Sequence, residues 1–279
     1  MPTLWNKGLQ DRWLAFFIFY FYFYFMRIVT LLSDFGNTHY VSEMKAVIYK
    51  LCDYASVVDI THKIEKFNVL HGAFILKRSY SYFPKNTVHV AVVDPGVGGK
   101  RKGIVIKTNN YYFVGPDNGL LSLAAKEDGI RQIVEIENKK YFLENVSATF
   151  HGRDIFAPVA AYIARGVDIS KFGRSIVEYE SIELKASISG DKIIGHVVDV
   201  DDFGNLITNI PFSIIEQAGI SKVSLKNKEL RILKTFCEAR AGEMFAYKGS
   251  AGTLEIGVNK GSAKEMLDIG IGEKIWLKY

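Results

Sequence analysis

The stretch VAVVDPGVGGKRKG, residues 90–103, decides the fold of the first part of this 279-residue chain. It begins with the apolar run Val90 to Val93, which has the length and composition of a strand buried in a parallel sheet. The run stops at Asp94, because the proline and glycine that follow turn the backbone. A carboxylate therefore follows a central strand, with the cations Lys100 to Lys102 across a glycine-rich loop. Ligands of open α/β sheets bind at this end of the strands. The alternative is an ordinary turn between a strand and a loop, with basic residues that are only solvated.

The segments before this stretch repeat a strand–helix pattern. An apolar run over residues 28–32 ends next to Asp34, helical spacing follows over 40–51, and a second strand is predicted over 56–60. Asn68 is a favourable N-cap for a further helix, which leads into the strand that ends at Asp94. The order βαβαβ predicts parallel strands with right-handed crossovers. Asp34 and Asp94 then both lie at the carboxyl ends of central strands.

Composition bounds the class of protein. A hydrophobic content of 48% with 23% charged residues predicts a globular protein of one or two domains. The net charge of +5 is mild and the lysines are scattered, so we expect no nucleic-acid partner. Cys52 and Cys237 are far apart in the chain, and we expect both to be free, buried thiols in a cytoplasmic protein; one disulfide, in a protein from a hyperthermophile, is the alternative.

The first 26 residues differ in composition from the rest of the chain. Residues 13–26 read WLAFFIFYFYFYFM, which is shorter than the about 20 apolar residues of a membrane span and has no signal-peptide cleavage site. Because Met26 directly precedes the first strand, we expect residues 1–25 to be an upstream extension outside the fold; a hydrophobic anchor is the alternative. We expect no membrane association unless this extension is retained.

The remaining chain divides at a polar stretch, residues 178–191. Before it we expect an α/β domain over residues 26–185, built on a central, mostly parallel sheet. After it, short apolar runs separated by glycine-rich turns predict a smaller all-β domain over residues 190–279, of barrel or sandwich type.

Candidate chemistry gathers at a few polar positions. His151 stands beside Arg153 and Asp154, before a helix predicted over residues 158–164, and histidine titrates near neutrality. The chain has no HExxH, CxxC, Walker or GxSxG motif, which argues against a zinc peptidase, a P-loop nucleotidase and an α/β-hydrolase. Three possibilities stay open: an enzyme for a nucleoside-type ligand, a metal-dependent phosphohydrolase using Asp34, Asp94 and His151, and a non-catalytic ligand sensor.

Six motifs, in order, resemble those of the S-adenosyl-L-methionine (SAM) hydroxide adenosyltransferase family, the hydrolase relatives of the fluorinases and chlorinases. They are LLSDFG at 31–36, VVDPGVGGKRKG at 92–103, VGPDNGLL at 114–121, TFHGRDIFAPVAA at 149–161, DDFGNLITNI at 201–210 and LEIGVNKGSA at 254–263. The resemblance runs from about Ile28 to the C-terminus. It implies that water attacks C5′ of SAM and displaces methionine, with no metal and no cofactor. It also implies a homotrimer with each site between two subunits.

The resemblance assigns roles to individual residues. It implies a catalytic set of Asp94, Arg101 and His151, with Asp34 binding the ribose hydroxyls. It places a substrate-binding set around the rest of the ligand, in which Asp201 faces the methionine ammonium: Phe150, Gly152, Asp201, Phe203, Asn205, Asn259 and Lys260. The halogenases carry a serine where Gly152 stands and an aromatic residue where Asp94 stands, so water is favoured over halide. Chlorinase-like activity and a non-catalytic SAM- or adenosine-binding protein are the alternatives.

One departure from the family pattern concerns the methionine carboxylate. An arginine is expected beside it, and this chain has Asn259-Lys260 instead. Lysine keeps the positive charge but lacks the bidentate fork of a guanidinium group. The departure therefore bears on the affinity for the methionine part of the substrate.

Overall fold

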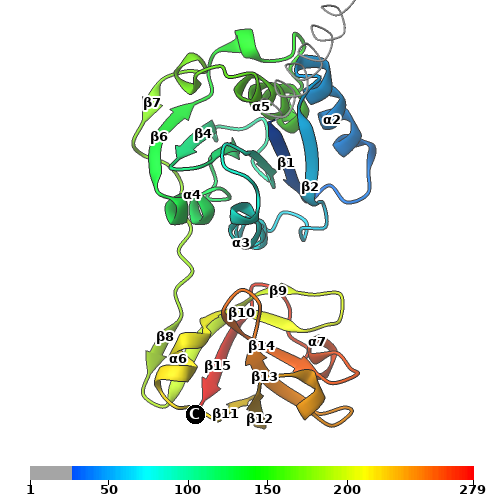
Figure 1. Ribbon diagram of the computed structural model, residues 1–279, viewed down its shortest axis with the longest axis vertical. Coiled ribbons are helices and arrows are strands. Elements are labelled where there is room, and N and C mark those ends of the chain that lie inside the picture. The colour runs from blue at the N-terminus through cyan, green and yellow to red at the C-terminus, as the bar shows by residue number, and fades with distance from the viewer. Residues whose placement is uncertain (1–26) are drawn as a thin grey trace, which may run out of the picture.

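The computed structural model describes residues 27–279 (Figure 1), so the expectations about residues 1–25 lie outside the described residues. These residues form one seven-stranded and one eight-stranded sheet, in sequence order. The first sheet carries helices and the second closes on itself. The predicted α/β domain followed by a smaller all-β, barrel-like domain is therefore confirmed.

The first sheet has the strand order β2-β1-β3-β5-β4-β6-β7. Its neighbours β2, β1, β3 and β5 run parallel, and β4, β6 and β7 pair antiparallel at one side. The bounds of the strands are β1 (Ile28–Ser33), β2 (Ser56–Thr61), β3 (Val88–Val92), β4 (Gly103–Thr108), β5 (Tyr112–Pro116), β6 (Ile130–Glu135) and β7 (Ser175–Ile176). The predicted parallel βαβαβ start is confirmed, and the stretch at 90–103 supplies the strand beside β1 on the side away from β2.

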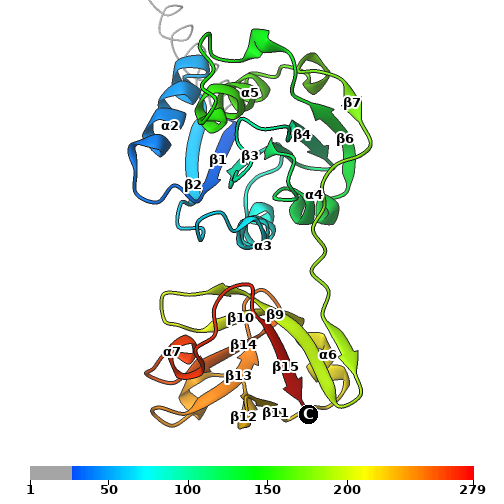
Figure 2. The same cartoon turned by 180° about the vertical axis from the view of Figure 1, so that it is seen from behind.

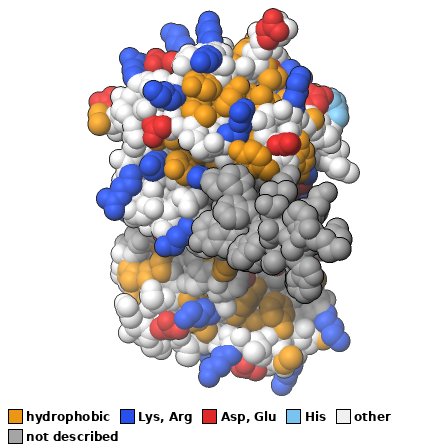
Figure 3. All heavy atoms as spheres, turned by 45° about the horizontal axis from the view of Figure 1, so that its top comes forward, with side chains coloured by type: hydrophobic (Ala, Val, Ile, Leu, Met, Phe, Trp, Pro, Cys, Tyr) orange, Lys and Arg blue, Asp and Glu red, His pale blue; other side chains and the backbone are white. Residues whose placement is uncertain are grey.

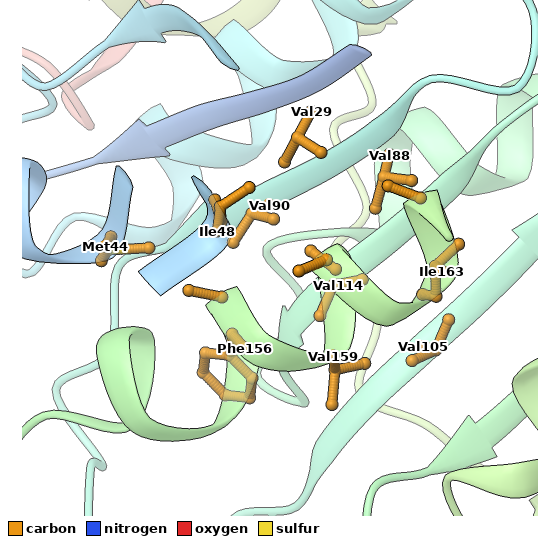
Figure 4. Packing of buried hydrophobic residues seen from close by; sticks show 14 of the residues in the cluster. Val29, Met44, Ile48, Val88, Val90, Val105, Val114, Phe156, Val159 and Ile163 are labelled. Atoms are coloured by element: carbon orange, nitrogen blue, oxygen red, sulfur yellow. The ribbon is translucent and has the colours of Figure 1, made fainter. Parts of the chain in front are cut away.

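Helices cover both faces of this sheet. They are α2 (His39–Leu51), α3 (Val69–Ser79), α4 (Ser122–Asp128) and α5 (Ala157–Ala164). Strand β3 shows why both faces are apolar: Val88 and Val90 pack with α2 and α5, as Figure 4 shows, whereas Ala91 packs with α3 and α4 on the opposite face. Asn68 caps α3 as predicted, because its side chain accepts the backbone N–H of His71.

The second sheet is a closed barrel. Seven strands follow in the order β10-β14-β13-β12-β11-β15-β9, and β9 pairs with β10 to complete the ring, while β8 adds to β9 from outside. The strands are β8 (Ser187–Ser189), β9 (Lys192–Val200), β10 (Leu206–Pro211), β11 (Lys222–Leu225), β12 (Lys228–Leu233), β13 (Met244–Lys248), β14 (Thr253–Val258) and β15 (Lys274–Lys278). Two short helices, α6 (Phe212–Gln217) and α7 (Ala263–Leu267), which the sequence analysis did not predict, both pack against β14.

Helix α3 makes the main contact between the two domains. It lies on the barrel side of the first domain in both views (Figures 1 and 2) and packs against β9. Phe74 is buried with Val198 and Ile207 of the barrel, and His71 Nε2 lies 3.1 Å from Asp199 Oδ1. The chain itself crosses between β7 and β8. The two domains are thus joined by an apolar and a polar contact as well as by the chain.

Two local expectations need correction. The helix predicted from Pro158 begins earlier, because a π-helical turn over Gly152–Phe156 leads directly into α5, so His151 stands at the start of a helical segment. Both cysteines are free as expected, but only Cys52 is buried and Cys237 is exposed.

The described part of the chain was expected to have neither a membrane-spanning helix nor a basic stripe for nucleic acid. No helix within residues 27–279 combines the length and the apolar character needed to cross a membrane. On the face shown in Figure 3, lysine and arginine side chains lie scattered among apolar and uncharged ones. The basic groups visible on that face therefore form no continuous stripe.

Candidate active site

A pocket of about 390 Å³ lies at the carboxyl ends of β1 and β3. Five predicted residues line it, namely Asp34, Asp94, Phe150, His151 and Gly152. The other lining residues are Phe35, Thr38, Tyr40, Lys66, Phe67, Val92, Val97 and Thr149. We call this the sheet pocket. It stands where ligands bind in open α/β sheets.

Asp94 and Arg101 form a buried ion pair beside this pocket. Arg101 Nε donates to Oδ1 and Oδ2 of Asp94 at 2.9 and 3.0 Å, and Nη2 donates to Oδ2 at 2.5 Å. Their side chains are only 5% and 13% exposed, respectively. Such a two-point guanidinium–carboxylate contact fixes both orientation and charge. The metal-dependent phosphohydrolase is not favoured, since among residues 27–279 no three His, Cys, Asp or Glu side chains gather closely enough to hold a metal ion.

The glycines after Asp94 allow Arg101 to fold back on it. Gly98 has φ +74°, and a Cβ there would lie 2.2 Å from the carbonyl oxygen of Ala148. Only glycine tolerates both the left-handed conformation and the close backbone. The loop therefore lies against the segment just before His151, although that segment is some 50 residues further along the chain.

His151 completes the cluster. Arg101 Nη2 lies 2.8 Å from His151 Nδ1, and because a guanidinium group has no acceptor, Nδ1 accepts this hydrogen bond and Nε2 carries the proton. Burial and the neighbouring Arg101 hold the pKa of His151 below its usual value of 6.5, in spite of the opposing charges of Asp94 and Asp154. The imidazole is therefore neutral near pH 7, with an N–H group that can hold a polar ligand.

Arg153 and Asp154, the polar neighbours of His151 in the sequence, have a structural role. Asp154 is fully buried and accepts hydrogen bonds from Arg153 Nε at 2.7 Å and from the backbone of Ser147 at 2.8 Å. Arg153 also reaches Glu43 of α2 at 2.8 Å. These contacts tie the π-helical turn to α2 and to the preceding loop. They hold His151 in place rather than forming part of the pocket wall.

Asp34 lies on the same pocket without capping a helix. Its Oδ2 accepts the backbone N–H of Phe67 at 2.9 Å, whereas the N-cap of α2 is Thr38. The loop with Lys66 and Phe67 was not among the predicted site residues. Phe67 has φ +65° and a 70% exposed side chain, which marks a strained, aromatic loop tip. The sequence signal that could have indicated this loop is the N-cap Asn68, because a loop precedes the start of a helix.

A second pocket, of about 660 Å³, lies on the barrel. Four of the predicted residues line it, namely Asp201, Phe203, Asn205 and Lys260, together with Phe236, Val258 and Gly261, which were not predicted. We call this the barrel pocket. Asn259, also predicted, is placed differently: its amide donates to the carbonyl oxygen of Ala239 at 2.8 Å.

The turn between β9 and β10 builds the centre of the barrel pocket. Asp201 Oδ1 accepts the backbone N–H groups of Phe203 and Asn205 at 3.0 and 2.9 Å, and Oδ2 accepts the Asn205 amide at 2.8 Å. Gly204 has φ +80° and leaves no room for a Cβ, which would meet Ser262 Oγ at 2.1 Å. Phe203 stays 80% exposed at the tip of this turn. The turn thus presents an oriented carboxylate and an aromatic face.

Comparison with known proteins places this geometry. Family models described as the SAM hydroxide adenosyltransferase N-terminal and C-terminal domains match residues 29–173 and 195–276. An (R)-S-adenosyl-L-methionine hydrolase of Methanocaldococcus jannaschii is 35% identical over 271 residues, covering 90% of this chain and 96% of its own. A fluorinase of Nocardia brasiliensis is 25% identical over 289 residues, covering 90% and 96%.

The fold is matched as well. A crystal structure of an uncharacterized conserved protein from Thermotoga maritima superimposes with a TM-score of 0.84 at 41% identity, covering 90% of this chain and all of that one. Both family models fall on the domains that carry the two pockets, so the match extends over sheet and barrel alike. The chain therefore belongs to the SAM hydroxide adenosyltransferase family.

Proposed function

We propose that this protein hydrolyses S-adenosyl-L-methionine to adenosine and L-methionine. The observation that carries the proposal is the partly buried, hydrogen-bonded set of Asp94, Arg101 and His151 beside Asp34, at the ligand-binding edge of the sheet. The relative from M. jannaschii is named as a hydrolase of the (R) form of S-adenosyl-L-methionine. The chain is accordingly an enzyme of the hydrolase type.

The reaction is a displacement at C5′. The oxygen of water forms a bond to C5′ while the C5′–S bond breaks. The electron pair of the C5′–S bond stays on sulfur, so methionine leaves as a neutral thioether. The water proton goes to a base and then to solvent, leaving the 5′-hydroxyl of adenosine. Water is a weak nucleophile with a pKa of about 15.7, so the site must help remove this proton.

The hydrogen bonds divide the work among the three residues. Asp94 is the base, because His151 Nδ1 already accepts a hydrogen bond from Arg101 and has no free lone pair. The Nε2–H of His151 then holds the oxygen of the attacking water, and Arg101 holds Asp94 and His151 at a constant distance. Groups preorganised in a pocket with little water lower the barrier without rearranging during the reaction.

The two pockets bind different parts of the substrate. In the sheet pocket Asp34 takes the ribose hydroxyls, with Phe150 and Gly152 beside the reacting carbon. In the barrel pocket Asp201 faces the methionine ammonium, with Phe203 and Asn205 beside it and Lys260 toward the carboxylate. Asn259 acts indirectly, through the loop that it ties to Ala239.

We further propose a homotrimer in which the sheet pocket of one subunit faces the barrel pocket of the next. Within a single subunit the two pockets share no lining residue. Phe67 and Phe203 are 70% and 80% exposed at the rims, as expected of aromatic residues that another subunit covers. Light scattering on the purified protein tests this: a trimer mass is expected, and a monomer that turns over SAM would overturn it.

We propose that the enzyme works in the cytoplasm and without a metal or other cofactor. The sulfonium group leaves as a neutral thioether, so the leaving group needs neither an acid nor a Lewis acid. SAM hydrolysis is therefore expected to continue at an unchanged rate in excess chelator. A rate that falls with chelator and returns with a divalent cation would contradict this.

Halide transfer is the second candidate, because fluorinases are relatives of this chain. Two residues favour water instead. Gly152 has no hydroxyl to hold a halide, and a Cβ there would already press on Met44 Sδ at 3.3 Å. Asp94 would repel an anion at the position where the nucleophile attacks.

One experiment separates these readings. The protein is incubated with SAM in H₂¹⁸O containing excess chloride, and the products are analysed by mass spectrometry. Adenosine labelled at the 5′-oxygen is expected. A 5′-chloro-5′-deoxy product would identify a halogenase, and intact SAM that raises the melting temperature of the protein would identify a binding protein without turnover.

A further inference from the structure

We propose that His62 is a positioning residue that directs Asp34 toward the ribose. It belongs to a series of side-chain contacts that links Ser33, His62, Asp59 and Lys45. The inference rests on the proposed function, since it deepens the role of Asp34 in the sheet pocket. None of the four lines the sheet pocket, so each would act on the substrate through Asp34.

The chain of contacts starts at the residue before Asp34. Ser33 Oγ lies 2.7 Å from His62 Nδ1, and His62 Nε2 lies 3.1 Å from Asp59 Oδ1. The other oxygen of Asp59 accepts a hydrogen bond from Lys45 Nζ of α2 at 2.6 Å. The contacts therefore run from the turn after β1, across the end of β2, to the neighbouring helix.

The hydrogen bonds of Ser33 and Asp59 have consistent directions. His62 Nε2 is buried close to Asp59 Oδ1 without an aligned hydrogen bond, and with the proton on this nitrogen Nδ1 accepts the hydroxyl proton of Ser33. Ser33 Oγ in turn accepts the backbone N–H of Phe35 at 3.3 Å. Burial would raise the pKa of Asp59, but Lys45 and His62 lower it overall, so this carboxylate stays charged. Ser33 and Asp59 thus have hydrogen-bond partners within this set, and His62 is tied to it by the bond to Ser33 and by its closeness to the Asp59 carboxylate.

The backbone binds the same two segments together. Gly36 N–H donates to the carbonyl oxygen of His62 at 2.7 Å, and Ile64 N–H donates to that of Ser33 at 3.4 Å. An irregularity between Leu31 and Leu32 in the pairing of β1 with β2 brings Thr61 opposite Leu32. The irregularity inserts one additional residue into β2, and this insertion places His62 beside Ser33. The turn that carries Asp34 is therefore held on both sides of the carboxylate.

The same three residue types occur in hydrolytic triads, but this set is built for positioning. Ser33 is 1% exposed and is covered by the sheet and its neighbours, so no substrate can reach its hydroxyl. Asp34, the next residue, does line the pocket. A bond that restrains Ser33 restrains the direction in which Asp34 points. Small errors in the placement of a binding group are costly, which is the physical reason for such support.

The test compares two ligands that differ only where Asp34 would act. Binding of adenosine and of 2′,3′-dideoxyadenosine, which lacks both hydroxyls, is measured by calorimetry for the wild-type protein and its variants. Ser33→Ala and His62→Gln are expected to weaken adenosine binding roughly tenfold, the loss of an ordinary hydrogen bond, and to leave the dideoxy ligand within about twofold. The KM for SAM should rise with little change in kcat.

Matched variants separate positioning from a general loss of structure. The Oδ1 of His62→Asn can take the place of Nδ1 toward Ser33, so this variant should keep adenosine affinity within about threefold, unlike His62→Gln. His196→Gln, a half-buried histidine on β9, is the control and should change neither ligand. If Ser33→Ala does not fold, the pair His62→Asn and His62→Gln carries the test alone.

Three outcomes would count against the inference. Equal weakening of both ligands would show a structural role for His62 only. Unchanged adenosine binding in Ser33→Ala and His62→Gln would show that the chain does not aim Asp34. A wild-type protein that binds neither adenosine nor SAM would overturn the proposed function itself, and this inference with it.

Discussion

The sheet pocket and the barrel pocket are built in opposite ways. At the sheet pocket, the loop that carries Asp94 and Arg101 meets the distant segment that carries the neutral His151, and the side chains of the Asp94–Arg101 ion pair are only 5% and 13% exposed. In the barrel pocket, the five-residue turn at 201–205 holds its own carboxylate through its own backbone, and Phe203 stays 80% exposed. The first arrangement suits chemistry, and the second suits recognition.

The physical reason is the environment of the charges. Away from water, oriented charges interact strongly and lose little to solvent, which favours a reacting centre. A solvent-facing turn offers weaker interactions but can be covered by a ligand or another subunit. The following predictions test this division of work, from the largest expected effect to the smallest.

The largest effect is expected for Asp94→Asn, which keeps the shape of the side chain but removes the base. We expect kcat to fall by about 10² to 10⁴, with KM for SAM changed by no more than about threefold. Adenosine release, followed by chromatography, measures both constants. Asp202→Asn is the matched control, because this carboxylate is 92% exposed and lines neither pocket. A loss confined to KM would place Asp94 among the binding residues.

The second prediction concerns the acid side of the pH profile. As pH falls through the pKa of His151, Nδ1 gains a proton, can no longer accept from Arg101, and activity is lost. Since burial and Arg101 both lower this pKa, the loss is expected below pH 6.5. Arg101→Met removes one lowering cause and leaves the raising charges of Asp94 and Asp154, so the acid limb must move to higher pH.

The rate provides a second reading of the same variant. Arg101→Met is expected to lower kcat about 100-fold, as for the loss of one preorganised donor. Arg101→Lys keeps a positive charge beside His151, so its acid limb should stay near that of the wild type. Measurement of kcat/KM across the acid range decides. A limb that stays in place in Arg101→Met would show that His151 does not control it.

The third prediction addresses the barrel pocket. Asp201→Asn is expected to raise KM for SAM about tenfold, equivalent to about 1.4 kcal/mol, because the ammonium of methionine loses its partner. The turnover number should stay within about twofold, since no reacting atom lies on the barrel. Asp202→Asn again serves as control. A fall in kcat as large as that of Asp94→Asn would break the distinction between the two pockets.

The smallest effect is expected for Lys260→Arg. Lys260 lines the barrel pocket, and a guanidinium group can bind the methionine carboxylate with two hydrogen bonds where lysine offers a point charge. We expect KM to fall about two- to fivefold with kcat unchanged. Lys264→Arg, an exposed lysine on α7, controls for the general effect of the substitution. An unchanged KM would mean that Lys260 does not reach the carboxylate.

Much of this protein followed from local patterns in its sequence. Short continuous apolar runs located the strands, because a strand that is covered on both faces is apolar along its length. Asn68 predicted a helix start, because its side chain needs only the N–H group three residues later. The motifs around Asp34, Asp94, His151 and Asp201 indicated the family. The turn at 201–205 was also accessible, since its hydrogen bonds lie within five residues.

Only the tertiary structure decided the contacts between distant segments. Arg101 reaches His151 across 50 residues of chain, and Ser33 reaches His62 across 29. It also showed that Arg153 and Asp154 brace His151, and that β9 pairs with β10 to close the barrel. No local pattern encodes such contacts, because they depend on how the packed sheet, its loops and a strand irregularity bring separate segments together. The sequence by itself determined which groups are present, and packing decided which of them act together.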